Sequence, residues 1–225
     1  MHIEPGIVTG AKLVLSYGTA AAAGGYTAKL VWDHIKSFDV ARLAIGTVVS
    51  TILTFIFFQV LPHFPVGVSE VHFILGSTLF LLFGAAPAAI GLALGLLAQG
   101  MLFAPIDLPQ YAINLTTLLA PLYAMSILAK RIIPAGTKYV DVSYGQALAL
   151  STAFQAGVVA WVAFWAFYGQ GFGATTVTSV MSFGVAYMMV ILIEPLADLA
   201  VLAGAKTLRY TNIARIFTPR LFASA

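Results

Sequence analysis

Long apolar segments constrain the fold of this chain more than any other feature. Only 8% of its 225 residues are charged and 60% are hydrophobic, whereas a soluble domain carries about a quarter charged residues. A helix of about 20 apolar residues crosses a bilayer. Such segments are expected at 9–30, 43–61, 70–84, 86–104, 111–130, 145–169 and 174–204. Because the apolar runs are continuous rather than alternating, we predict an all-α, polytopic helix bundle and not a β-barrel.

The number of spans has one alternative. The segment 43–61 contains no charged residue. The third and fourth segments are separated only by Gly84-Ala85-Ala86-Pro87 and could form one bent hairpin of two short helices. We therefore predict seven spans, with six as the alternative, in a single transmembrane domain over residues 1–225.

The basic residues predict the orientation of the bundle. Ten of the eleven lie in three places: the segment between spans one and two, the segment between spans five and six, and the C-terminal tail at 205–225. The intervening loops near 62–71, 105–110 and 169–174 contain none. Because cytoplasmic loops are enriched in Lys and Arg, the C-terminus is predicted to be cytoplasmic and the N-terminus external.

Composition excludes several classes of function. The chain has no cysteine and a formal charge of only +3, so disulfides, thiolate metal sites and nucleic-acid partners are not expected. It contains no phosphate-binding loop for ATP. No basic region or small-residue cleavage site marks a signal peptide, so we expect a multi-pass protein of the cell (inner or plasma) membrane that begins at Met1 and is not itself an enzyme.

The first two residues, Met1 and His2, offer a compact metal chelate. The terminal amine, the His2 amide and the His2 imidazole can bind one ion through fused five- and six-membered rings. Such a set suits Ni(II), Cu(II) and, less strictly, Co(II). Because the amide proton must leave, binding is expected to weaken below neutral pH.

The other histidines differ in their surroundings. His34 is expected to be a solvated residue of a cytoplasmic loop. His63 lies in an interfacial turn, Pro62-His63-Phe64-Pro65, where a structural role is expected, with support of a metal site as the alternative. His72 is expected to begin a helical run and to enter the bundle, where polar groups are costly and usually functional.

Four segments resemble one known family. They are Met1-His2-Ile3-Glu4-Pro5-Gly6, Ser69-Glu70-Val71-His72-Phe73-Ile74-Leu75-Gly76, Ala112-Ile113-Asn114-Leu115, and the fourth-span stretch Gly91–Phe103. Together they are similar to the cobalt/nickel substrate-capture (M-type) subunits of energy-coupling-factor (ECF) ABC transporters. The likeness covers most of the chain but is close only at these segments.

The resemblance implies a site and a set of partners. An external N-terminal segment (1–8) would cap the bundle, with the Met1 amine, the His2 amide and imidazole, and His72 as ligands of Co(II) or Ni(II). The resemblance also suggests that Asn114 orients an imidazole. In addition, we expect Ser69 and His63 to be supporting residues of the site. ATP hydrolysis would come from cytoplasmic ATPases acting through a membrane coupling subunit, and a small accessory membrane subunit is a further possible partner. No permanently bound cofactor is implied.

Three features depart from this pattern or suggest another function. Pro5 stands where the family commonly has an acidic residue, Glu4 precedes it, and Glu70 is unusual in the His72 motif. Glu194 and Asp198 could form a proton or cation path, which makes a self-sufficient secondary carrier or channel the runner-up. We favour instead a proline-broken turn at Glu194 and pairing of Asp198 with Lys206 or Arg209.

A third hypothesis is an intramembrane hydrolase that uses Ser77 or Ser69 with His72. It is weak, because the sequence has no nucleophile-elbow motif.

Overall fold

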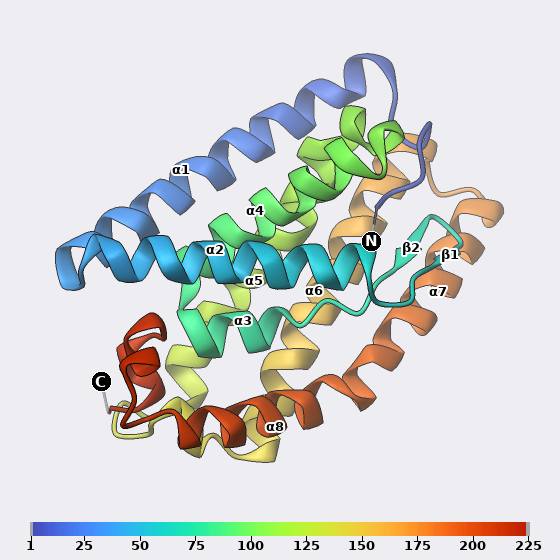
Figure 1. Ribbon diagram of the computed structural model, residues 1–225. Coiled ribbons are helices and arrows are strands. Elements are labelled where there is room, and N and C mark those ends of the chain that lie inside the picture. The colour runs from blue at the N-terminus through green and yellow to red at the C-terminus, as the bar shows by residue number, and fades with distance from the viewer. Residues whose placement is uncertain (1, 224–225) are drawn as a thin grey trace.

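The computed structural model describes residues 2–223 and is a bundle of long helices with a small hairpin at one end (Figure 1). The α-helices are α1 (Leu13–Ser37), α2 (Val40–Gln59), α3 (Gly76–Phe83), α4 (Ala85–Leu102), α5 (Tyr111–Ile132), α6 (Tyr144–Gln170), α7 (Ala174–Met188) and α8 (Glu194–Thr207). Strands β1 (Phe64–Val66) and β2 (Ser69–Val71) form the hairpin. Short 3-10 helices are η1 (Gly10–Lys12), η2 (Pro105–Gln110), η3 (Tyr139–Asp141), η4 (Met189–Leu192), η5 (Asn212–Ile216) and η6 (Pro219–Leu221).

The predicted membrane class is confirmed. Five helical segments of the described chain are long and apolar enough to cross a bilayer: 40–59, 85–102, 105–132, 144–170 and 174–207. The helix α1 is also long, with 25 residues, and carries its charges near its C-terminal end. The protein is therefore a polytopic helical membrane protein.

The prediction for the third span is wrong in its first half. Residues 70–75 do not form a helix, because the chain there belongs to β2 and then runs without regular structure into α3. With eight residues, α3 is only about 12 Å long and cannot cross a bilayer core of about 30 Å. It ends at Gly84, whose φ of 85° is a left-handed conformation that favours glycine, and α4 begins at the next residue.

The last predicted span is bent. Helix α7 ends at Met188, the 3-10 turn η4 follows, and α8 begins at Glu194 with Pro195 in its first turn. A proline there lacks the N–H that would continue the preceding helix. The proline-broken turn predicted at Glu194 is confirmed.

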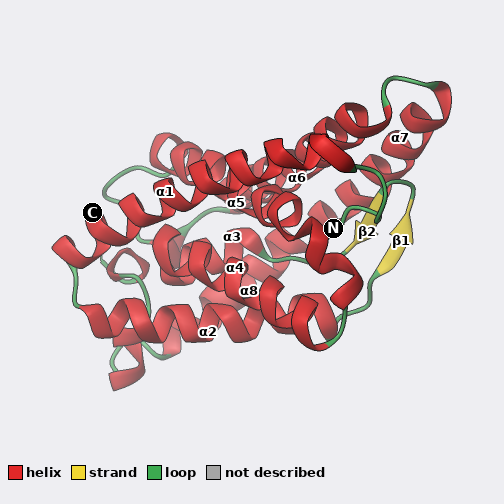
Figure 2. Ribbon diagram, turned by 90° about the horizontal axis from the view of Figure 1, so that it is seen from above, coloured by secondary structure: helices red, strands yellow, loops and turns green. Residues whose placement is uncertain are grey.

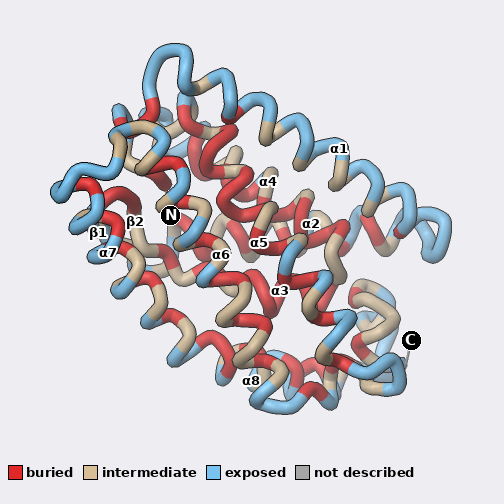
Figure 3. Tube along the Cα trace, turned by 180° about the vertical axis from the view of Figure 1, so that it is seen from behind, coloured by how far each residue is buried: buried red, intermediate tan, exposed pale blue. Residues whose placement is uncertain are grey.

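Close packing of small residues joins α2 to α4. A Cβ atom added at Gly91 would lie 2.2 Å from the Cβ of Ser50, so only glycine permits this approach, as is common between membrane helices. Buried positions are concentrated on the inner helices, whereas much of α1 is exposed (Figure 3). The core of the bundle is thus formed by the helices that surround α3.

The two ends of the bundle differ. The hairpin and the described start of the chain lie together at one end, and the C-terminal segment lies at the other (Figures 1 and 2). Residues Asp33 and His34 of α1, Lys130 of α5 and Arg220 of η6 line one cavity at the C-terminal end. We call this the basic end, and the distribution of Lys and Arg predicts that it faces the cytoplasm.

Candidate metal site

The N-terminal segment is held beside the hairpin by an isolated β-bridge and backbone hydrogen bonds. Ile3 forms an antiparallel bridge with Ser69, and the Glu70 amide donates to the His2 carbonyl at 3.1 Å. The Ser69 hydroxyl donates to the same carbonyl at 2.8 Å, and the Glu4 amide donates to Val68 at 3.1 Å. These bonds satisfy buried backbone groups and fix the position of His2.

Asn114 on α5 holds the N-terminal segment by a hydrogen bond. Its Oδ1 on α5 accepts the Ile3 amide at 3.0 Å, and both residues are 1% exposed. The described contact is with the backbone next to His2 rather than with an imidazole ring. Asn114 therefore positions the segment that carries the predicted ligand.

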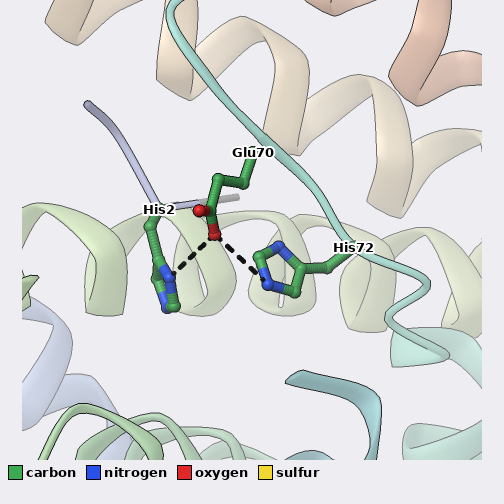
Figure 4. A group of neighbouring side chains, drawn as sticks. All are labelled: His2, Glu70 and His72. Atoms are coloured by element: carbon green, nitrogen blue, oxygen red, sulfur yellow. Dashed lines mark ion pairs between the residues drawn. The ribbon is translucent and has the colours of Figure 1, made fainter. Parts of the chain in front are cut away.

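His2, Glu70 and His72 converge on one point (Figure 4). One ligand atom from each lies within 4.8 Å of the others. Glu70 Oε2 lies 3.3 Å from His2 Nδ1 and 3.5 Å from His72 Nε2. Both rings are buried, at 3% and 0% exposure. The arrangement gives two imidazole nitrogens and a carboxylate oxygen that can share one ion.

A second carboxylate lies beside His2. Asp107, in η2, places Oδ2 at 3.2 Å from His2 Nδ1. A cavity of about 10 Å³, lined by His2, Asp107, Asn114 and Gln99 among others, adjoins the ring. That volume is about one water-sized sphere, so the surroundings of His2 leave room for a single small species.

Aromatic rings enclose the histidines. Phe58 stacks on His2 with centroids 5.2 Å apart and lies 4.9 Å from the His72 ring. His63 stacks on His72 at 4.8 Å and an interplanar angle of 7°. The structure thus places His63 beside the site, and also in a turn where its Nδ1 lies 3.2 Å from the Leu61 carbonyl.

The electrostatics favour binding of a cation. Interaction with the His2 ring lowers the pKa of the Glu70 carboxyl, which keeps it anionic. Burial lowers the pKa of the His72 imidazole, which keeps it neutral and able to donate a lone pair to a metal. Imidazole nitrogen with carboxylate oxygen suits divalent first-row transition metals better than Mg(II) or Ca(II), which prefer oxygen alone.

Met1 lies outside the described residues, so its predicted ligand atom stays a prediction. The other sequence-predicted residues, His2, His72, Asn114, Ser69 and His63, are brought together. Sequence reasoning missed Glu70 and Asp107 as possible ligands. Residues 70 and 72 lie in a segment that the sequence predicts to be helical. In an extended chain, alternate residues point to the same side, so the two-residue spacing of Glu70 and His72 is the sequence signal for their proximity.

The remaining polar residues are placed elsewhere. The predicted pairing of Asp198 with Lys206 or Arg209 is wrong. It accepts hydrogen bonds from Ser77 and Thr78 in the bundle interior, whereas Lys206 pairs with Asp141 at 3.0 Å. The difference arises because α3 begins inside the bundle, and its first turn brings the Ser77 and Thr78 hydroxyls to α8.

Ser77 is occupied by these acids. Its hydroxyl contacts Glu194 Oε1 at 2.8 Å and Asp198 Oδ2 at 2.7 Å. It belongs to that network rather than to a pair with His72, and Ser69 binds backbone. Neither arrangement is that of an activated nucleophile.

His34 also differs from its prediction. It lies in the last turn of α1 and is 9% exposed, so it is not a solvated loop residue. It lines the cavity at the basic end, away from the other three histidines.

Comparison with known families identifies the class of protein. A family model described as "cobalt uptake substrate-specific transmembrane region" matches residues 2–211. Searches of curated proteins and of solved structures gave no significant match. The family match covers nearly the whole chain, including both buried histidines of the site and the Asn114 anchor. The chain belongs to the cobalt uptake substrate-specific transmembrane family.

Proposed function

We propose that this protein captures Co(II) at the hairpin end and presents it to an ATP-driven importer of the energy-coupling-factor type. The observation that carries the proposal is the convergence of His2, Glu70 and His72 on one buried point. The family supports cobalt as the substrate. His2 and His72 supply nitrogen, Glu70 supplies oxygen, and the Met1 amine with the His2 amide would complete the set.

The ligand chemistry bears on the choice of metal. Four nitrogens in a plane suit Ni(II), whereas a carboxylate within the set introduces oxygen and departs from that arrangement. Cobalt accepts mixed nitrogen and oxygen ligands in several geometries. We therefore infer that Co(II) is preferred, with Ni(II) as the competing cargo.

The transport step requires other subunits under this proposal. The sequence contains no phosphate-binding loop, so energy would come from cytoplasmic ATPases through a membrane coupling subunit, with a small accessory subunit as a further possible partner. The predicted orientation places the site outside the cell (inner or plasma) membrane and the basic end toward the ATPases.

The test is metal content and binding by the purified full chain. Elemental analysis and isothermal titration with Co(II) and Ni(II) would be made on the natural protein and on a variant with one alanine inserted after Met1. The insertion disrupts the chelate rings but keeps every side chain. An alanine inserted between Ala135 and Gly136, which are both exposed, is the matched control.

We expect the first insertion to abolish tight cobalt binding and the control insertion to keep it. Retention of cobalt by both variants would refute a ligand set that includes the N-terminus. If His72→Ala and Glu70→Gln both still bound cobalt, that result would refute the whole site.

The secondary-carrier alternative rests on the buried acids. Glu194 and Asp198 are both 0% exposed and are joined through Ser77. Proteoliposomes that contain only this chain separate the two functions. Cobalt uptake without partner subunits or ATP would support a carrier, and uptake that requires them would support the importer.

A further inference from the structure

A polar cavity lies at the basic end, at the opposite end of the bundle from the metal site. Its volume is about 480 Å³, large enough for a small ligand or a headgroup. It is enclosed by the end of α1, the start of α4, the end of α5 and the C-terminal segment around η6. We call it the basic-end pocket.

Two cations line this pocket without a carboxylate partner. Within residues 2–223, neither Lys130 nor Arg220 belongs to an ion pair. The one carboxylate in the lining, Asp33, is held by Lys29 at 2.8 Å. The lining therefore holds two cations, Lys130 and Arg220, against the single carboxylate of Asp33, which Lys29 already pairs.

Two buried nitrogens in the lining also lack a hydrogen-bond partner among the described residues. They are His34 Nε2 and Arg220 Nε. His34 is 9% exposed, and an unpaired buried donor is costly. Arg220 Nη2 donates to the Ile133 carbonyl at 3.0 Å and the Pro134 carbonyl at 3.1 Å, which holds the guanidinium group in place beside the pocket.

The start of α4 opens into the same pocket. Gly84, Ala85 and Ala86 are part of the lining, and no side chain caps this end of the 18-residue helix. The first amides of a helix have no acceptor within it, and the helix dipole adds a partial positive charge there. Amides at a helix start, a lysine, an arginine and a histidine are together the donors that bind phosphate groups.

Residues beside the pocket indicate that it lies at the depth of the lipid headgroups. Trp32 directly precedes the lining residue Asp33 on α1 and is 60% exposed, and Lys36 Nζ lies 4.9 Å from its ring centroid. Tryptophan and lysine are typical of the headgroup layer. Basic pockets between membrane helices on the cytoplasmic side bind anionic headgroups.

We propose that the basic-end pocket binds a phosphate group, carried either by an anionic phospholipid or by a soluble phosphate. Lys130, Arg220, His34 and the start of α4 hold its oxygens. The inference does not depend on the metal site.

The experiment compares two adjacent basic residues in the full-length protein. Lys130 and Arg131 are both exposed at the end of α5, but only Lys130 lines the pocket. Lys130→Gln and Arg131→Gln remove the same charge from the same end of the molecule. Delipidated protein is titrated with phosphatidylglycerol, by native mass spectrometry, and with inorganic phosphate, by ³¹P NMR.

We expect Lys130→Gln to weaken binding about tenfold, which is the usual contribution of one charged hydrogen bond, and Arg131→Gln to have little effect. Selective binding of phosphatidylglycerol identifies a headgroup, and binding of inorganic phosphate with the same Lys130 dependence identifies a soluble ligand. Absence of binding of both probes, or equal losses in both variants, would overturn the proposal. Ala86→Asp is a second variant that places a carboxylate in the pocket and should also weaken binding. Cobalt binding verifies that each variant is folded.

Discussion

The hydrogen bond from Ile3 to Asn114 gives the sharpest test of how the metal site is assembled. Asn114→Ala removes the only side-chain acceptor described for the Ile3 amide. That amide is buried, since Ile3 is 1% exposed, and an unsatisfied buried donor costs about 1–3 kcal/mol. The other bonds of the segment, to Val68, Ser69 and Glu70, remain.

The cost should appear as weaker cobalt binding rather than as unfolding. If the segment must be docked for His2 to bind metal, the apparent dissociation constant rises as the docked fraction falls. A loss of about 1.4 kcal/mol in docking corresponds to about a tenfold change. We therefore expect Asn114→Ala to weaken Co(II) binding by roughly tenfold. The loss of affinity is smaller if docking in the natural protein is so stable that most molecules of the variant remain docked.

The assay is titration calorimetry combined with limited aminopeptidase digestion. Asn212→Ala changes the other asparagine of the chain, which is exposed, and is the matched control. Asn114→Asp keeps an acceptor oxygen and should recover part of the affinity. Cobalt binding by Asn114→Ala at the natural affinity, with the N-terminus still protected from digestion, would refute the reasoning.

Three further predictions concern the site and the packing. Glu70→Gln removes the anionic oxygen between the two rings and should weaken Co(II) binding by about ten- to a hundredfold, measured by calorimetry against Asp39→Asn; an unchanged affinity would exclude Glu70 as a ligand. Cobalt affinity should fall as the pH decreases from about 8 to about 6, because the terminal amine and the His2 amide must lose protons, whereas His72, whose pKa burial lowers, stays neutral; a titration series showing constant affinity would argue against an amide-bonded ion. Gly91→Val would clash with Ser50 and should lower the unfolding temperature by several degrees, while Gly18→Val, with no atom within 4 Å of the added Cβ, should have little effect; equal thermal shifts would contradict the packing argument.

The helical spans could be predicted because the membrane imposes them. Apolar runs of about 20 residues have few alternatives in lipid, where every backbone group must be satisfied within the segment. The expected segments at 43–61, 86–104 and 111–130 agree closely with α2, α4 and α5. Segment 70–84 was predicted incorrectly because its first residues pair with β1 in the hairpin. The Glu70 amide also donates to the His2 carbonyl, a partner far away in the chain.

The site could be predicted only in part. His2 and His72 follow from the sequence, since a histidine at position 2 has its own chelate geometry and a histidine at membrane depth is costly. The sequence marks Glu70 only as a departure from the family pattern, and it does not indicate Asp107 as a ligand. The positions of both carboxylates beside His2 depend on other elements, β2 for Glu70 and η2 for Asp107.

Three properties can be read from the residues alone: the chain is a membrane helix bundle, its basic residues gather at one end, and it resembles cobalt/nickel-capture proteins. Hydropathy and charge act on each segment wherever it lies in the fold, so these properties do not require knowledge of distant contacts. Three other features depend on the folded arrangement: the N-terminal segment pairs with the hairpin, Glu70 lies between two imidazoles, and Ser77 binds the acids of α8. Those contacts join residues far apart in the chain, and their geometry is fixed by packing and by the need to pair buried polar groups.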